Sequence, residues 1–133
     1  PSGVRVLLDT HAWIWRLLAP ERLSADAERA VAESDGPVHL SPISTWETLV
    51  LARKGRLSLA PSPAEWVLDA LRRSAPSAVP ISHGIALRSE ALDGFGSADP
   101  ADRFIVASAI EHDLVLVTAD TAMHDYGPVT TLW

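Results

Sequence analysis

Two aspartates stand directly behind apolar segments that are suited to buried strands. The segment VRVLL, residues 4–8, runs into Asp9, and the segment VLVT, residues 115–118, leads through one alanine to Asp120. A carboxylate at such a position can cap the helix that follows it. It can also line a ligand site, because the carboxyl ends of parallel strands meet at one edge of a sheet. The repetition raises the question of whether the two aspartates share one site.

Two further acids, Glu47 and Asp102, stand near the starts of predicted helices. Glu47 is three residues after Ser44 in STWE, which fits a capping box, and in DPAD Asp99 is a candidate N-cap with Asp102 as its reciprocal acid. Taken singly, each acid is explained as a cap. Taken together, they converge on one sheet edge if the strands before them are neighbours. The converging set would be Asp9, Glu47, Asp102 and Asp120.

Carboxylates gathered at one point raise each other's pKa, so a cation is needed to neutralise them. Oxygen ligands and the absence of cysteine favour a hard divalent cation, Mg²⁺ or Mn²⁺. Such a cation activates water and binds phosphate oxygens, which makes phosphodiester hydrolysis the expected chemistry. The five histidines form no helical pair and no cluster. We expect surface or structural roles for most of them. His11 follows Asp9 closely and could reach the rim of the pocket, although we expect it to pack.

The elements that must position these acids alternate along the chain. Apolar runs predict strands at residues 4–8, 38–40, 78–81, 115–118 and 129–132. Helical patterns cover residues 10–18, 24–33, 44–54, 63–74, 83–92 and 100–112, and a short last helix can follow Asp120. This alternation predicts an α/β fold with a mostly parallel sheet covered on both faces. The length predicts a single domain over residues 1–133.

The composition narrows the classes of partner. A net charge of −6 argues against a nucleic-acid binder held by a basic surface, but it allows an acidic site that binds a metal and then a phosphate. No apolar run is long enough to span a bilayer, and no segment resembles a signal peptide, so we expect no membrane partner. A chain without cysteine suits a reducing cytoplasm.

Three stretches carry a resemblance to a known family. They are LLDTHAWIW at residues 7–15, SPISTWETLVLARKGRLSL at 41–59 and DPADRFIVASAIEHDLVLVTAD at 99–120. In this order they resemble the PIN domain family, and within it the VapC-type toxin ribonucleases of toxin–antitoxin modules. The resemblance implies a PIN-like three-layer α/β/α sandwich and a Mg²⁺- or Mn²⁺-dependent endoribonuclease. It also implies RNA as substrate, a VapB-like antitoxin as partner, a homodimer and a cytoplasmic location.

The acids of the family pattern fall on Asp9, Glu47, Asp102 and Asp120, with none missing. The resemblance implies that the three aspartates hold the metal, directly or through water. Glu47 would complete the pocket and orient the attacking water. Thr118, two residues before Asp120, matches a small hydroxyl residue that is often present at this position in the family. Asp99 is interpreted as a helix cap or as a residue that supports the metal ligands without binding the metal itself.

Several cations and aromatic residues have more than one interpretation. Arg103, next to Asp102, is a candidate for contacting RNA phosphates. The cations at residues 53–56 complement the C-terminal end of a predicted helix or contact RNA. Helix 10–18 is apolar on more than one face, which indicates a partner surface on part of it. Trp46 and Trp66 could contribute to such a surface, although we expect both to pack in the core.

Two other classes of protein are excluded because residues that they require are missing from this chain. A phosphatase of the haloacid dehalogenase type needs an aspartate at position 11, where this chain has His11. A response-regulator receiver needs a lysine after a late strand, and the only lysine is Lys54. A PIN-like protein-binding module, in which the acids serve only as caps, remains an alternative.

Overall fold

A single parallel sheet organises the computed structural model, which describes residues 4–133. Its strands are β1 (Val6–Leu8), β2 (His39–Leu40), β3 (Ser77–Ala78), β4 (Val115–Val117) and β5 (Thr131–Leu132). The order across the sheet is β3-β2-β1-β4-β5, and every neighbouring pair is parallel. The predicted α/β fold is confirmed.

Helices connect the strands as the alternation predicts. They are α1 (Thr10–Leu18), α2 (Ala25–Ala32), α3 (Pro42–Arg53), α4 (Pro63–Ser74), α5 (His83–Ser89), α6 (Pro100–Glu111) and α7 (Thr121–Asp125), with a short 3₁₀ helix η1 (Pro20–Arg22). The sequence patterns did not predict η1. None of the helices between residues 4 and 133 is long and apolar enough to cross a membrane.

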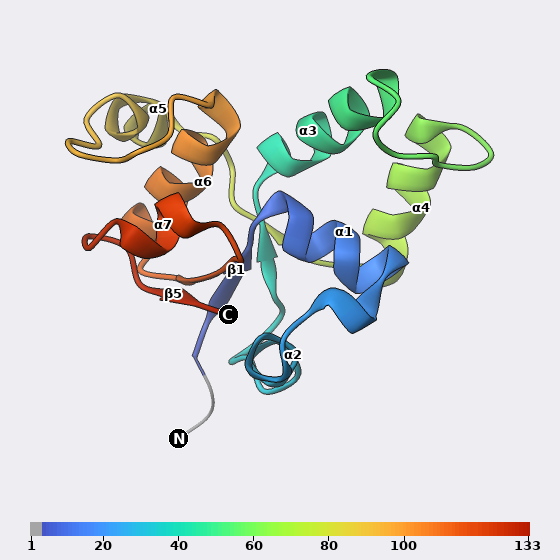
Figure 1. The fold of residues 1–133 in the computed structure, drawn as a ribbon, viewed down its shortest axis with the longest axis horizontal. Helices are drawn as coiled ribbons and strands as arrows, with labels where there is room; N and C mark the ends of the chain where they lie inside the picture. The colour runs from blue at the N-terminus through green and yellow to red at the C-terminus, as the bar shows by residue number, and fades with distance from the viewer. Residues whose placement is uncertain (1–3) are drawn as a thin grey trace.

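The sheet separates two apolar clusters, because successive strand residues point to opposite faces. On β1, Val6 and Leu8 pack with the buried residues of α1, α2 and α4. Leu7 points to the other face and packs with α5, α6 and α7. Figure 1 shows α1, α2 and α4 on one side of β1 and α5, α6 and α7 on the other. The protein is therefore a three-layer α/β/α sandwich.

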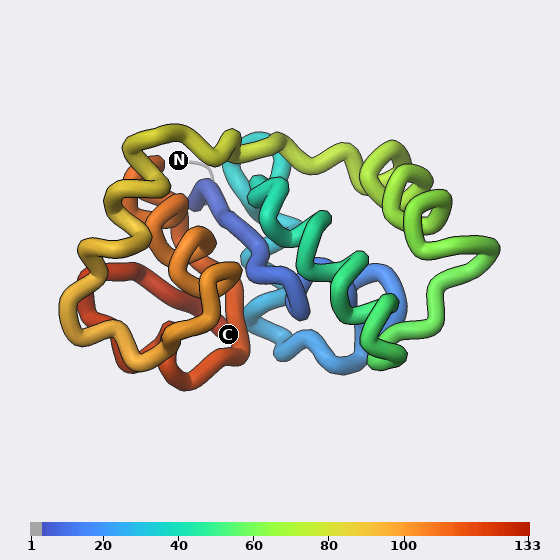
Figure 2. The backbone as a smooth tube through the Cα atoms, turned by 90° about the horizontal axis from the view of Figure 1, so that it is seen from above, coloured from blue at the N-terminus to red at the C-terminus, as the bar shows by residue number. Residues whose placement is uncertain are grey.

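The central strand β1 ends level with its two neighbours. Leu8 is paired with Leu40 of β2 and with Val117 of β4. The residues that follow these strand ends therefore start from one edge of the sheet. Seen from above in Figure 2, α3 and α6 lie on either side of the chain that leaves β1. This arrangement places the starts of three chain segments around one point.

Candidate metal centre

Asp9 is buried at the end of β1, where it has two structural contacts. Its side chain is only 6% exposed, and its Oδ1 accepts a hydrogen bond of 2.7 Å from the backbone N–H of Ala12, which caps α1. Its Oδ2 accepts a hydrogen bond from the hydroxyl of Thr118, which follows β4. This second contact follows from the register, because the Asp9 N–H also donates to the carbonyl of Val117. The predicted cap is confirmed, and it leaves Asp9 on the wall of a cavity.

Asp120 lies two residues after Thr118 on the same side of the sheet edge. Its Oδ1 accepts a hydrogen bond of 3.1 Å from the N–H of Met123, so it caps α7 as the sequence predicts. The N–H of Asp120 donates to the Thr118 hydroxyl, which therefore ties Asp9 and Asp120 together. A ring nitrogen of His124 forms a hydrogen bond with the carbonyl of Thr118, which holds the chain between β4 and α7 in place.

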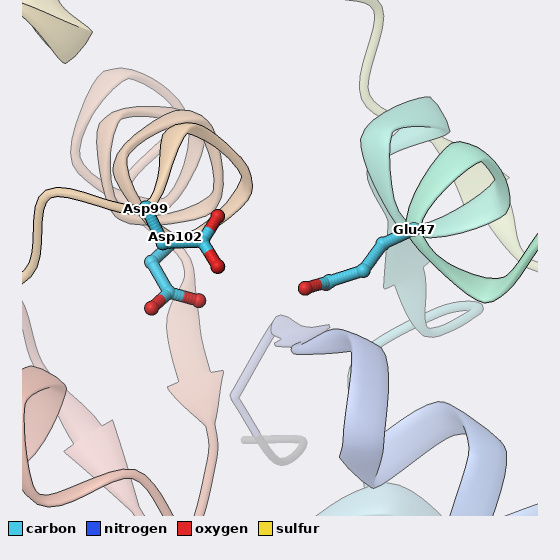
Figure 3. A group of neighbouring side chains, drawn as sticks. All are labelled: Glu47, Asp99 and Asp102. Atoms are coloured by element: carbon cyan, nitrogen blue, oxygen red, sulfur yellow. The ribbon is translucent and has the colours of Figure 1, made fainter. Parts of the chain in front are cut away.

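Glu47 comes from the second turn of α3, and the predicted capping box is wrong. The helix begins at Pro42 and is capped by Ser41, because proline is favoured at the first helical position. Ser44 therefore lies inside the helix, where its Oγ accepts a hydrogen bond of 2.9 Å from Thr10. With no cap to complete, Glu47 is free to reach across toward α6. Figure 3 shows its side chain directed at Asp99 and Asp102.

Asp99 and Asp102 stand at the start of α6. Asp99 caps the helix through the N–H of Ala101, at 2.9 Å, as predicted. Asp102 is not the reciprocal acid of that cap, because the N–H of Asp99 donates to Ser97 instead. The Ser97 hydroxyl in turn donates to Oδ2 of Asp102, at 2.9 Å. Ser97 was not singled out from the sequence, although its loop, DGFGSADP, has the composition of a flexible and often functional loop.

These acids share one cavity of about 370 Å³. Its lining includes all four acids of the predicted set, from four different segments, together with Asp99 and His11. One carboxylate oxygen each of Glu47, Asp99 and Asp102 lies within 4.8 Å of the others. The structure thus places Asp99 among the closest acids, where the sequence interpretation put it behind the ligands. His11 is exposed on the cavity wall, which fits the rim position considered for it, and its ring centroid lies 5.7 Å from that of Trp15.

The cavity raises the pKa of three of its carboxyl groups. Burial and, to a smaller extent, the nearby charges of Asp99, Asp120 and Glu47 raise the pKa of Asp102 to about 6, although the hydrogen bond from Ser97 opposes the shift. Burial also raises the pKa of Asp9, although its hydrogen bonds from Thr118 and Ala12 oppose the shift. The pKa of Glu47 is raised by burial as well. Without a cation, these groups resist ionisation.

This donor set fits a hard divalent cation. All the candidate ligands are carboxylate oxygens from rigid elements, and no thiol is present in the chain. Burial and then mutual repulsion raise the pKa of Asp102, and a dication among these acids would offset both effects. Helix capping alone does not explain why these acids converge, because Glu47 and Asp102 cap no helix here.

Other predicted residues lie away from the cavity lining. The guanidinium of Arg103 donates to the carbonyls of Ser89 and Ser97, at 2.8 and 3.0 Å, so it holds the loop that carries Ser97. Trp46 is 52% exposed, which contradicts the core position expected for it. Trp66 packs edge-on against Trp13, with ring centroids 6.1 Å apart, as predicted.

Comparison with known proteins fits this geometry. The sequence matches the PIN domain family profile over residues 6–127. The chain belongs to the PIN domain family. It is 35% identical to "Ribonuclease VapC22" of Mycobacterium tuberculosis over 130 residues, which cover 96% of this chain and 98% of that protein.

Solved structures support the PIN fold along nearly the whole chain. A toxin–antitoxin complex from Klebsiella pneumoniae contains a chain that is 25% identical, with a TM-score of 0.67 and coverage of 95% of this chain and 96% of that one. FitAcB from Neisseria gonorrhoeae is 24% identical, with a TM-score of 0.67 and 96% coverage of both chains. This second likeness shows the fold alone.

Proposed function

We propose that this PIN domain is a metal-dependent endoribonuclease and the toxin of a VapBC-type toxin–antitoxin system. The observation that carries the proposal is the cavity in which Asp9, Glu47, Asp102 and Asp120 meet from four segments of the chain. The identity with a curated VapC ribonuclease over nearly the full length supports RNA as the substrate.

We propose Asp9, Asp102 and Asp120 as the residues that hold the metal, with Glu47 completing the set. The metal would be Mg²⁺ or Mn²⁺, and when bound it supplies an activated water and neutralises charge on the phosphate. Asp99 joins these residues as a candidate ligand because its carboxylate lies beside those of Glu47 and Asp102. The site needs no side-chain nucleophile.

Each protein group then has a defined task. Glu47 lies across the cavity from Asp102, where it can orient the attacking water and accept its proton (Figure 3). Thr118 holds Asp9 and the chain at Asp120 in register, so both carboxylates keep their directions. Ser97 orients Asp102, and Arg103 fixes the loop that carries Ser97.

The partners follow from the same relatives. The likeness to a chain of a toxin–antitoxin complex supports a VapB-like antitoxin as partner. The resemblance to the family also implies a homodimer of the toxin, which we propose here. Residues 1–133 would form one domain, and a toxin that cuts RNA would act in the cytoplasm. The partner surface predicted on part of α1 remains a prediction of this proposal.

The test is RNA cleavage by the purified chain with Mg²⁺ or Mn²⁺, compared with Asp102→Asn. This variant keeps an oxygen that can accept the Ser97 hydrogen bond, and Asp102 caps no helix, so the fold should survive. We expect activity to fall by more than about 100-fold, since loss of groups that merely support ligands costs 10–100-fold. Asp69→Asn on α4, outside the cavity, is the control and should retain activity.

The alternative function is a PIN-like protein-binding module without nuclease activity. It would be favoured if the wild-type chain cleaved no RNA with either metal and calorimetry detected no metal binding. RNA cleavage and metal binding that both disappear in Asp102→Asn would exclude this alternative.

A further inference from the structure

The acidic cavity opens into a second hollow between α1 and α3. This hollow has a volume of about 580 Å³ and shares His11, Trp15, Glu47 and Asp99 with the acidic cavity. Its other walls come from α1, η1, α3 and the turn after α3. We call it the α1–α3 groove. An RNA that is cleaved internally continues beyond the scissile bond, and this groove is continuous with the acidic cavity.

In the described part of the chain, five cations without an ionic partner lie on the elements that form this groove, and two of them line it. Five arginines pair with acids, and Arg5 donates to the carbonyl of His112. Within residues 4–133, the remaining cations have neither an ion pair nor a hydrogen bond. They are Arg16, Arg22, Arg53, Lys54 and Arg56, all on α1, η1 or the C-terminal end of α3 and its following turn. In a chain of net charge −6, this segregation favours a polyanion on that side.

Two of these cations, Arg22 and Arg56, line the groove itself. The guanidinium of Arg22 lies over the ring of Trp15, with 4.2 Å from Cζ to the ring centroid. Stacking fixes the plane of the guanidinium while its N–H donors stay available for the oxygens of a phosphate. Complementing a helix C-terminus cannot account for Arg22, because η1 has only three residues.

The floor of the groove is apolar, with Ile14 and Leu18 from α1 and Leu51 and Leu57 from α3 and its following turn. Single-stranded nucleic acid binds where cations contact its phosphates and aromatic side chains stack with its bases. The groove combines Arg22 and Arg56 with Trp15, and its apolar floor adds surface that bases can cover. A duplex would keep its bases away from the floor.

We infer that the α1–α3 groove binds the single-stranded RNA substrate on one side of the scissile phosphate, with Arg22 and Arg56 contacting backbone phosphates. This inference rests on the proposed nuclease function and adds to it a path for the substrate. We expect RNA as the occupant because the groove shares its wall with the cavity in which the phosphodiester must lie, and because two arginines that have no ion pair among the described residues line it.

The test compares the groove variant Arg22→Gln/Arg56→Gln with the control variant Arg72→Gln/Arg73→Gln. Both double variants change the net charge by the same amount. The control arginines lie on α4, where they pair with Asp69. The probe is a labelled single-stranded RNA, whose KM is measured with wild-type catalytic acids and whose binding is measured by fluorescence anisotropy in an Asp102→Asn background. We expect KM and Kd to rise about tenfold for the groove variant. The slope of log K against log salt should fall by about 1.4, from two phosphate contacts at about 0.7 each.

Equal KM, Kd and salt slope for the groove variant and the control would overturn the inference while leaving the nuclease function intact. So would unchanged RNA binding together with weakened binding of a partner protein, which would make the groove a protein interface. Failure of the proposed function would look different, because the wild-type chain itself would not cleave RNA. Thermal melts of both double variants and the single variant Arg56→Gln, at an exposed residue, separate loss of binding from loss of fold.

Discussion

Replacing Asp102 by asparagine should stabilise the metal-free protein at neutral pH while removing its activity. Burial and neighbouring acids raise the pKa of Asp102 from its ordinary value of 3.8 to about 6. The folded chain therefore holds more protons than the unfolded chain between these pH values, and the free energy of unfolding falls as pH rises through this interval. Asparagine has no charge to desolvate, so the variant escapes this loss.

The expected magnitude follows from the pKa. A rise from 3.8 to about 6 corresponds to about 3 kcal/mol for a fully buried group. Asp102 is only half-buried, and solvent screening reduces the effect, so we expect the variant to gain about 1 kcal/mol at neutral pH. Below the ordinary pKa of 3.8, Asp102 is protonated in both the folded and the unfolded wild type, so the stability gain of the variant should vanish.

The assay is urea unfolding with EDTA present, at neutral pH and near pH 4, for the wild type and Asp102→Asn. Asp69→Asn serves as a control of opposite sign, because hydrogen bonds from Arg72 and Arg73 lower the pKa of Asp69. That variant should be less stable than the wild type at neutral pH. An Asp102→Asn variant that is destabilised at neutral pH, or equally affected at both pH values, would refute the electrostatic account of the cavity.

Three further outcomes follow from the same contacts. Saturating Mg²⁺ or Mn²⁺ should raise the Tm of the wild type but not of Asp102→Asn, and the increase measured by thermal melts should shrink below pH 6 because protons compete for the carboxylate. Thr118→Val should lower the free energy of unfolding by about 2 kcal/mol in urea titrations, because buried Asp9 loses its hydroxyl donor, and unchanged stability would contradict that contact. Arg103→Met should reduce RNA cleavage about tenfold although Arg103 does not line the cavity, because the loop carrying Ser97 loses its anchor; full activity in cleavage assays would argue against that role.

The fold was predictable because its signals are local. Apolar runs alternating with amphipathic segments gave the strands and most helices, and an apolar strand end followed by a carboxylate located Asp9 and Asp120 at one edge. Their capping contacts were predictable too, since a cap involves residues only three apart. The start of α3 was misplaced, because Ser41 and Pro42 form a stronger start signal than the Ser44 box.

The sequence by itself determined the parallel α/β architecture, because strands and helices follow from patterns of residues close together in the chain. It also determined which acidic residues follow the strands and begin the helices, because these positions are local too. Only the tertiary structure decided that Asp99 and Asp102 lie beside Glu47 and that His11 faces the same cavity. These relations depend on where α1, α3 and α6 pack around the sheet edge. Packing of that kind is set by the whole core, so no local pattern encodes it.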